Sequence, residues 1–103
     1  LYVSGQIPLD PECGELVGNS FAEQCHRVLL NLKIILEAGG SGLKHVLKVT
    51  IYMKNLAQFG ELNEIYSEYF DDSKPARVCV EVSNLPKGAD VEMDAIAEIS
   101  SVN

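Results

Sequence analysis

Apolar residues recur with a helical period over one long stretch of the chain. From Phe21 to Leu36 they follow one another at steps of three and four residues, which predicts an amphipathic helix with one broad apolar stripe. Ser20 and Glu23 stand at the spacing of a capping box at the start of this helix. The pair Gly39-Gly40 is expected to end it.

A second helix and four strands follow from the same analysis of the pattern. The helix is predicted over Leu56 to Phe70, and the Asn55 side chain can cap its first turn. The first strand-like run is rich in β-forming residues, and the later three alternate between apolar and polar side chains, as strands with one buried face do. The predicted strands cover residues 1–7, 47–54, 76–82 and 91–99.

The order of these elements, strand–helix–strand–helix–strand–strand, indicates an α+β protein. Two amphipathic helices need an apolar surface to cover, and four strands need one buried face. A two-layer sandwich meets both needs, with one mixed sheet and both helices packed on one of its faces. The chain of 103 residues fits a single domain and contains no internal repeats or linkers.

One face of this sheet is predicted to stay uncovered by the chain itself. We expect the helices to cover the face formed by valine, alanine and methionine side chains, such as Val49, Val80 and Met93. A sheet face that is partly polar and partly apolar is a candidate subunit interface, a ligand site, or both. The uncovered face is predicted to carry Thr50, Tyr52, Arg77, Cys79, Glu92 and Asp94.

Composition and charge exclude several classes of function. The chain has 8 Lys and Arg against 15 Asp and Glu, a net charge of −7, whereas nucleic-acid modules normally carry a basic face. No apolar run approaches the roughly 20 residues that cross a bilayer, so no membrane partner is expected. The sequence has neither a glycine-rich dinucleotide motif nor a P-loop, so no nucleotide cofactor is indicated.

Cysteine usage indicates a reducing compartment and gives no sign of a metal site. Cys13, Cys25 and Cys79 are odd in number and far apart, no Cys-x-x-Cys pair exists, and the only histidines are His26 and His45. We therefore expect no metal, and the free thiols predict a cytoplasmic protein. The chain begins without a methionine, so we expect the natural N-terminus to be missing, which leaves a mitochondrial location open.

Two residues of the predicted uncovered face are the main candidates for chemistry. Arg77 begins a strand, and its planar fork of donors matches a carboxylate. The alternatives are a surface arginine or a structural ion pair with Glu81 or Asp94. Glu92 shares a face with Asp94, and a carboxylate near an arginine can act as general base on a positioned water. The alternative is that both acids merely solvate the strand.

Weaker signals come from Cys79 and from the pair Ser4-Gly5. Arg77 can favour a thiolate two residues away, but no base lies near in sequence, so packing or a backbone contact is favoured over a nucleophile. Gly5 leaves room for a ligand to approach the backbone, or marks a bulge or a sheet edge.

Taken together, these segments resemble one protein family, the reactive-intermediate deaminases, also called the Rid or YjgF-like family. The most specific run is Pro75-Ala76-Arg77-Val78-Cys79-Val80-Glu81-Val82, followed by the glutamate-bearing strand at residues 91–97. The other matching runs, in the family's order, are residues 4–8, 46–59, 62–66 and 85–87. The resemblance spans residues 1–103 as one domain.

The resemblance implies a chorismate-mutase-like α+β fold that assembles as a homotrimer with clefts between its subunits. It also implies hydrolysis of reactive enamine and imine acids to a 2-keto acid and ammonia. The substrates would be 2-aminoacrylate, with its tautomer 2-iminopropanoate, and 2-iminobutanoate. No metal or organic cofactor is implied, and the expected partner is a small imino or enamino acid rather than a nucleic acid or a membrane.

The resemblance also suggests roles for individual residues. Arg77 is similar to the arginine that binds the substrate carboxylate, and Glu92 to the acid that positions or activates the attacking water. Cys79 matches a position that contributes mainly backbone contacts, and Ser4-Gly5 matches the strand that lines the cleft. The helix positions that match residues near the site are Phe59 and Asn63.

The chain departs from the family in one respect, because it begins after the family's first strand and the Gly-Pro-Tyr segment before that strand. If that strand is truly missing, we expect both trimer stability and activity to suffer.

Two other functions stay open. One is a non-catalytic regulatory trimer in which Arg77 holds a keto acid. The other is RNA cleavage or translation inhibition, against which the net charge of −7 argues.

Overall fold

The computed structural model describes residues 1–99 of the chain. Within that range, four strands and two α-helices succeed one another in the predicted order. They are β1 (Tyr2–Gln6), α1 (Phe21–Ala38), β2 (Val46–Met53), α2 (Phe59–Tyr69), β3 (Ala76–Glu81) and β4 (Val91–Ala97). The existence and type of every predicted element are therefore confirmed, and the strand ends differ from the prediction by one or two residues.

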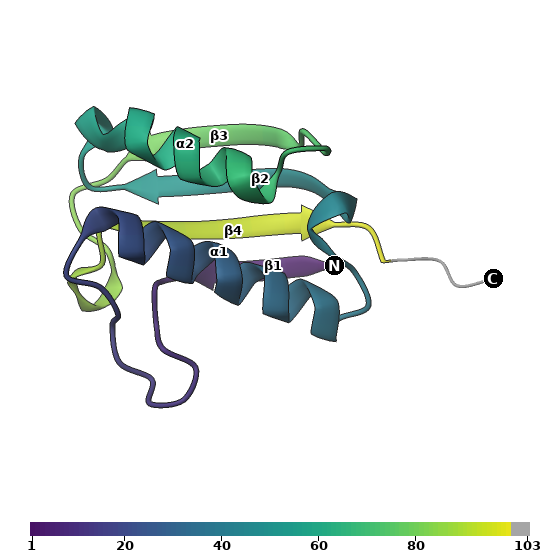
Figure 1. Ribbon diagram of the computed structural model, residues 1–103, viewed down its shortest axis with the longest axis horizontal. Coiled ribbons are helices and arrows are strands. Elements are labelled where there is room, and N and C mark those ends of the chain that lie inside the picture. Colours follow the sequence, from purple (N-terminus) through teal and green to yellow (C-terminus); the bar gives the residue numbers. More distant parts are fainter. Residues whose placement is uncertain (100–103) are drawn as a thin grey trace.

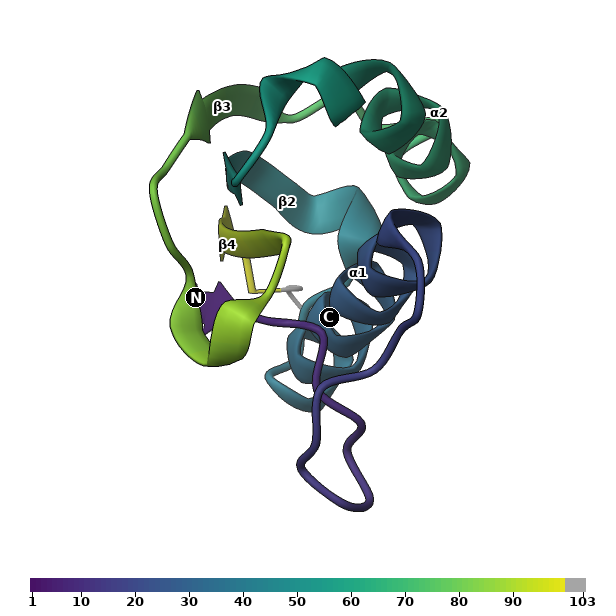
Figure 2. The ribbon, with the colours of Figure 1, turned by 90° about the vertical axis from the view of Figure 1, so that its left-hand side faces the viewer.

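The strands form one mixed sheet in the order β1-β4-β2-β3. β4 runs antiparallel to both of its neighbours, β1 and β2, while β3 runs parallel to β2 and is connected to it through α2. Figure 1 shows both α-helices lying over the same face of the sheet, and the end-on view in Figure 2 shows α1 and α2 together on one side of it. The predicted α+β arrangement, with both helices on one face of a mixed sheet, is confirmed.

The Ser20 cap forms as predicted, whereas Asn55 caps the short 3₁₀ turn before α2 rather than α2 itself. The Ser20 hydroxyl accepts a hydrogen bond from the Glu23 backbone N–H at 3.2 Å, which satisfies one of the free donors in the first turn of α1. The Asn55 side chain accepts one from the Ala57 backbone N–H at 2.9 Å. Because Leu56–Gln58 form a 3₁₀ turn, α2 itself begins three residues later than predicted.

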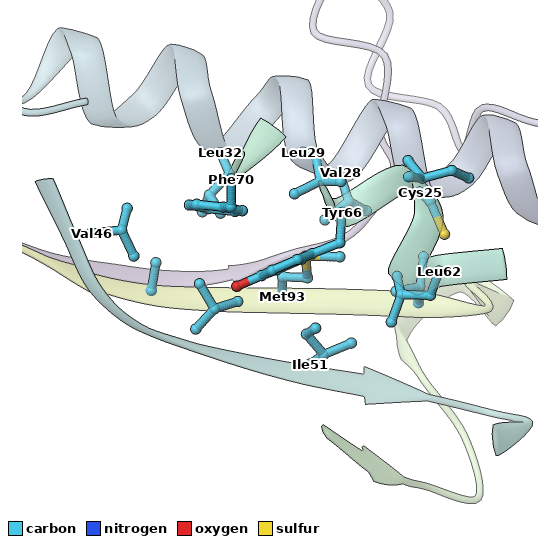
Figure 3. Packing of buried hydrophobic residues seen from close by; sticks show 14 of the residues in the cluster. Cys25, Val28, Leu29, Leu32, Val46, Ile51, Leu62, Tyr66, Phe70 and Met93 are labelled. Atoms are coloured by element: carbon cyan, nitrogen blue, oxygen red, sulfur yellow. The ribbon is translucent and has the colours of Figure 1, made fainter. Parts of the chain in front are cut away.

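The hydrophobic core fills the space between the two helices and the sheet, where side chains from both layers meet (Figure 3). Burial of this apolar surface is the main source of folding free energy. The helices contribute Cys25, Val28, Leu29, Leu32, Leu36, Leu62, Ile65 and Tyr66, and the sheet contributes Val3, Val46, Val49, Ile51, Met53, Val91, Met93, Ala95 and Ala97.

The register of β3 overturns one part of the predicted sheet. β3 pairs with β2 so that Arg77 lies beside Val49 and Cys79 beside Ile51. Paired residues point to the same face, and both of these β2 residues are fully buried under the helices. The prediction that Arg77 and Cys79 share the uncovered face with Glu92 is therefore wrong.

The uncovered face instead receives the valines of β3. Val78 and Val80 are paired with Thr50 and Tyr52 of β2, and they are 41% and 38% exposed. Alternation of side chains along a strand assigns them to two faces, but it does not determine which of the two faces packs against the helices. At this edge strand the more apolar face points away from the helices, so the open side of the sheet is more apolar than the sequence predicted.

We predict that two adjacent leucines of α1 differ sharply in their contribution to stability. Leu29→Ala empties a fully buried position and should lower the free energy of unfolding by about 3 kcal/mol. Leu30→Ala removes a side chain that is 37% exposed and should lower it by less than about 1 kcal/mol. Urea unfolding followed by circular dichroism measures both, and equal losses would contradict the packing described here.

Candidate active site

Arg77 is held by side chains from one face of α2. Phe59, Asn63 and Tyr66 lie four and three residues apart, so they follow one another along the same side of the helix. The guanidinium carbon lies 5.3 Å from the centre of the Phe59 ring and 4.8 Å from the centre of the Tyr66 ring. One terminal nitrogen donates to Asn63 Oδ1 at 2.7 Å. We call these three helix residues the arginine clamp.

The arginine clamp fixes the cation without neutralising it. Aromatic faces attract a guanidinium, and the bond to Asn63 uses only one of its five N–H groups. Of the two predicted alternatives, the structural ion pair with Glu81 or Asp94 is wrong, whereas Arg77 does lie exposed at the surface. The Glu81 carboxylate accepts a hydrogen bond from the backbone N–H of Leu56 at 2.9 Å. Among residues 1–99, the ion pair that is found is between Lys54 and Asp90. Arg77 is therefore positioned and free to bind an anion.

Cys79 presents its backbone, rather than a reactive thiol, beside Arg77. Its sulfur packs 3.4 Å from the sulfur of Met53, and burial raises the pKa of the thiol although the Arg77 charge lowers it. The backbone N–H of Val82 donates to the Met53 carbonyl at 2.8 Å. By the alternation of a parallel ladder, the N–H groups of Arg77 and Cys79 point away from β2, toward the free edge of the sheet.

Tyr66 is the member of the clamp that the sequence placed only in the helix core. It does pack there, with 7% of its surface exposed, and Figure 3 shows its ring directed from α2 over the sheet. Burial raises the pKa of its phenol and the nearby Arg77 charge lowers it. The spacing of Phe59, Asn63 and Tyr66 in the sequence indicates that they share one face of the helix. Their role in holding Arg77 could be inferred only once the position of Arg77 was known.

Glu92 belongs to the opposite face of the sheet. It is paired with Tyr52 of β2, on the side without helices. The neighbouring β1 bulges there, because the two residues Ser4 and Gly5 lie between its pairings with Ala95 and Met93. A Cβ atom added to Gly5 would overlap the Glu92 carboxylate. Glycine at this position therefore makes room for the acid, as bulges near functional sites often do.

Asp94 stands two residues along β4 from Glu92 and has a partner of its own. The Tyr52 hydroxyl donates to Asp94 Oδ2 at 2.9 Å. This hydrogen bond, with a smaller contribution from burial, raises the pKa of Tyr52. Asp94 is therefore engaged in a cross-strand contact, whereas no hydrogen bond to the Glu92 carboxylate is found among the described residues.

The predicted site residues thus form two separate groups within one copy of the chain. Arg77, Cys79 and the arginine clamp lie on the helix side, at the free edge of β3. Glu92 and Ser4-Gly5 lie on the other face, across β4 and β1. The sheet itself separates the cation from the acid, so one copy does not bring them together.

The described part of the chain holds neither a cluster of metal-ligating side chains nor a helix able to span a membrane. Among residues 1–99, no three His, Cys, Asp or Glu side chains gather closely enough to hold a metal ion. Neither of its α-helices combines the length and the apolar composition that spanning a membrane requires.

The chain folds as a small α+β protein with an open sheet face, and known proteins share this fold. Residues 1–99 match the family model described as Endoribonuclease L-PSP. A RutC family protein of Pyrococcus abyssi is 57% identical over 97 residues, which cover 94% of this chain and 76% of that protein. The 2-iminobutanoate/2-iminopropanoate deaminase of rat is 44% identical, covering 94% of this chain and 71% of the rat protein.

A solved structure agrees with this fold. The crystal structure of a Thermotoga maritima protein, described as a candidate endoribonuclease, superposes with a TM-score of 0.92 at 50% identity, covering 98% of this chain and 79% of that one. The chain belongs to the Rid family, which includes the RutC proteins and the L-PSP proteins.

Proposed function

We propose that the protein hydrolyses small 2-imino acids, and the 2-enamino acids that tautomerise to them, to 2-keto acids and ammonia. The substrates proposed are 2-aminoacrylate with its tautomer 2-iminopropanoate, and 2-iminobutanoate. The observation that carries the proposal is Arg77, a clamped guanidinium at the open edge of β3 that has no carboxylate partner among residues 1–99. The activity named for the rat relative supports the same chemistry.

Arg77 and the edge of β3 supply the binding half of the site. An imino acid has one fixed negative charge, and the free N–H groups of a guanidinium form paired, charge-assisted bonds to a carboxylate. The outward N–H of Cys79 is placed to donate as well. Because the cation is already oriented by Phe59 and Tyr66, little of its freedom remains to be lost on binding.

Glu92 supplies the second half, the activation of water. The water oxygen forms a bond to the imine carbon, while the carboxylate takes a proton from the water and passes it to the nitrogen. A second proton then moves from the new hydroxyl to the nitrogen, the C–N bond breaks, and ammonia leaves the keto acid. For an enamine, the same relay first delivers a proton to the terminal carbon and removes one from the amino nitrogen, which gives the imine. Such substrates already react with water, so positioning is the main requirement.

Assembly of identical copies would join the two halves. Within one copy the sheet separates Arg77 from Glu92, so a complete site needs Arg77 from one copy and Glu92 from another. The uncovered sheet face, with Val78 and Val80 exposed, offers an apolar surface for that contact. We propose a homotrimer with three such clefts, in which every copy contributes its cation to one cleft and its acid to the next.

The two alternative functions make different predictions for the same purified protein. A regulatory binder would bind a 2-keto acid through Arg77 without accelerating its formation. A ribonuclease is suggested by the family's name, but RNA would approach a protein of net charge −7 against electrostatic repulsion. Accelerated release of ammonia would support the deaminase over the regulatory binder. RNA cleavage that persists after further purification would favour the ribonuclease.

We predict that Arg77→Ala lowers kcat/KM for 2-iminobutanoate by about 100-fold, because the substrate carboxylate loses its charged partner. The imine is generated in situ by a threonine dehydratase, and ammonia release is compared with the spontaneous rate. Arg27→Ala is the matched control, since Arg27 donates to Asn31 on α1, away from the site. Full activity in Arg77→Ala, or no acceleration by the unmodified protein, would refute the proposal.

A further prediction concerns Glu92 and the glycine beside it. Glu92→Gln should lower kcat by about 100-fold with a smaller effect on KM, because the amide cannot take the proton from water. Gly5→Ala should act in the same direction, since its methyl group displaces the carboxylate.

Gly60→Ala is the control for the glycine substitution, because a Cβ atom at Gly60 meets no atom within 4 Å. Steady-state kinetics on all three variants provides the comparison. Unchanged turnover in Glu92→Gln would remove its role in water activation.

A further inference from the structure

A hollow of about 470 Å³ adjoins Arg77 on the side of α2. Its walls are the side of α2 and the segment that leads into β3. Two of the lining residues are cations, Lys74 and Arg77. The other lining residues are Asn63, Tyr66 and Ser67 of α2, Phe70 just after it, and Pro75. The hollow therefore begins at the proposed carboxylate-binding group and continues to a second positive charge.

The positive charge of this hollow is not compensated by a carboxylate in the part of the chain that the structure describes. No carboxylate is among its lining residues, and neither cation forms an ion pair within the described residues 1–99. Asp71 and Asp72, the nearest acids before Lys74 in sequence, line a different hollow together with Lys33 and other residues. On a chain of net charge −7, two unpaired cations around one hollow create a local potential that attracts anions.

The hollow is also larger than the smallest imino acids require. Its volume lies in the range of pockets that hold whole small-molecule ligands, whereas 2-iminopropanoate has only three carbons. Arg77 has one terminal nitrogen bonded to Asn63 and two aromatic rings nearby, so its remaining donors suit a single carboxylate. Lys74, a flexible point charge three residues earlier, is free for another anionic group.

We propose that Lys74 determines substrate specificity by binding a second anionic group, so that the preferred substrates are 2-imino acids with a carboxylate side chain. This inference rests on the proposed function, because it assigns Arg77 to the carboxylate beside the imine. Lys74 touches only the far end of the substrate. It therefore contributes to the selection of the substrate and takes no part in the reaction at the imine carbon.

Kinetics with paired substrates tests this assignment. Amino-acid oxidases generate the imines of L-aspartate and of 2-aminobutanoate in situ, and keto-acid release is followed for the unmodified protein, Lys74→Gln and Lys33→Gln. Lys74→Gln should lower kcat/KM for the acidic imine about tenfold and leave the alkyl imine within about twofold, since one charge-assisted contact is lost. Lys33→Gln removes an exposed lysine of another hollow and should change neither.

A binding measurement separates failure of this inference from failure of the proposed function. Calorimetric titration with 2-oxoglutarate and 2-oxobutanoate requires no turnover. Tighter binding of the dicarboxylate, lost in Lys74→Gln, supports the role of Lys74 even if no imine is hydrolysed. Equal binding of the two keto acids would overturn the role of Lys74. So would an equal effect of Lys74→Gln on the hydrolysis of both imines. If deamination persists in either case, the deaminase proposal stays intact.

Discussion

The parallel register between β2 and β3 decides on which side of the sheet the proposed carboxylate-binding residue of this protein lies. Because Arg77 is paired with Val49, its side chain points to the helices, where α2 can hold it. Because Glu92 is paired with Tyr52, its carboxylate points to the opposite side. A shift of one residue between β2 and β3 would exchange these faces for the whole of β3, and both Arg77 and the exposed valines would change places.

The same helix that buries the core also orients the cation. Leu62 and Ile65 of α2 pack into the core, Tyr66 does so while contacting Arg77, and Phe59 and Asn63 complete the arginine clamp. Rigid packing of α2 thus fixes the guanidinium before any substrate arrives, which is what positioning of a reactive substrate requires. Glu92 depends on a different local feature, the bulge at Ser4-Gly5, which makes room for its carboxylate.

Much of the fold can be predicted from the sequence because its signals are local. The periods of three to four and of two residues determine the helices and strands, and Ser20 and Asn55 mark helix starts by their own hydrogen bonds. The orientation of β3 could not be predicted, because alternation is symmetric between the faces and the register depends on a strand distant in sequence. The role of Tyr66 and the contact between Gly5 and Glu92 are likewise visible only once distant segments meet.

The central claim is that a complete site takes Arg77 from one copy and Glu92 from another. It is tested most directly by co-expressing the Arg77→Ala and Glu92→Gln chains with different affinity tags and purifying assemblies that carry both. In a cyclic trimer of mixed composition, one cleft in three combines an intact Arg77 with an intact Glu92. About one third of the unmodified activity should therefore return, although each variant alone keeps only about one hundredth of it. Mixed trimers that remain as inactive as the single variants would contradict the account.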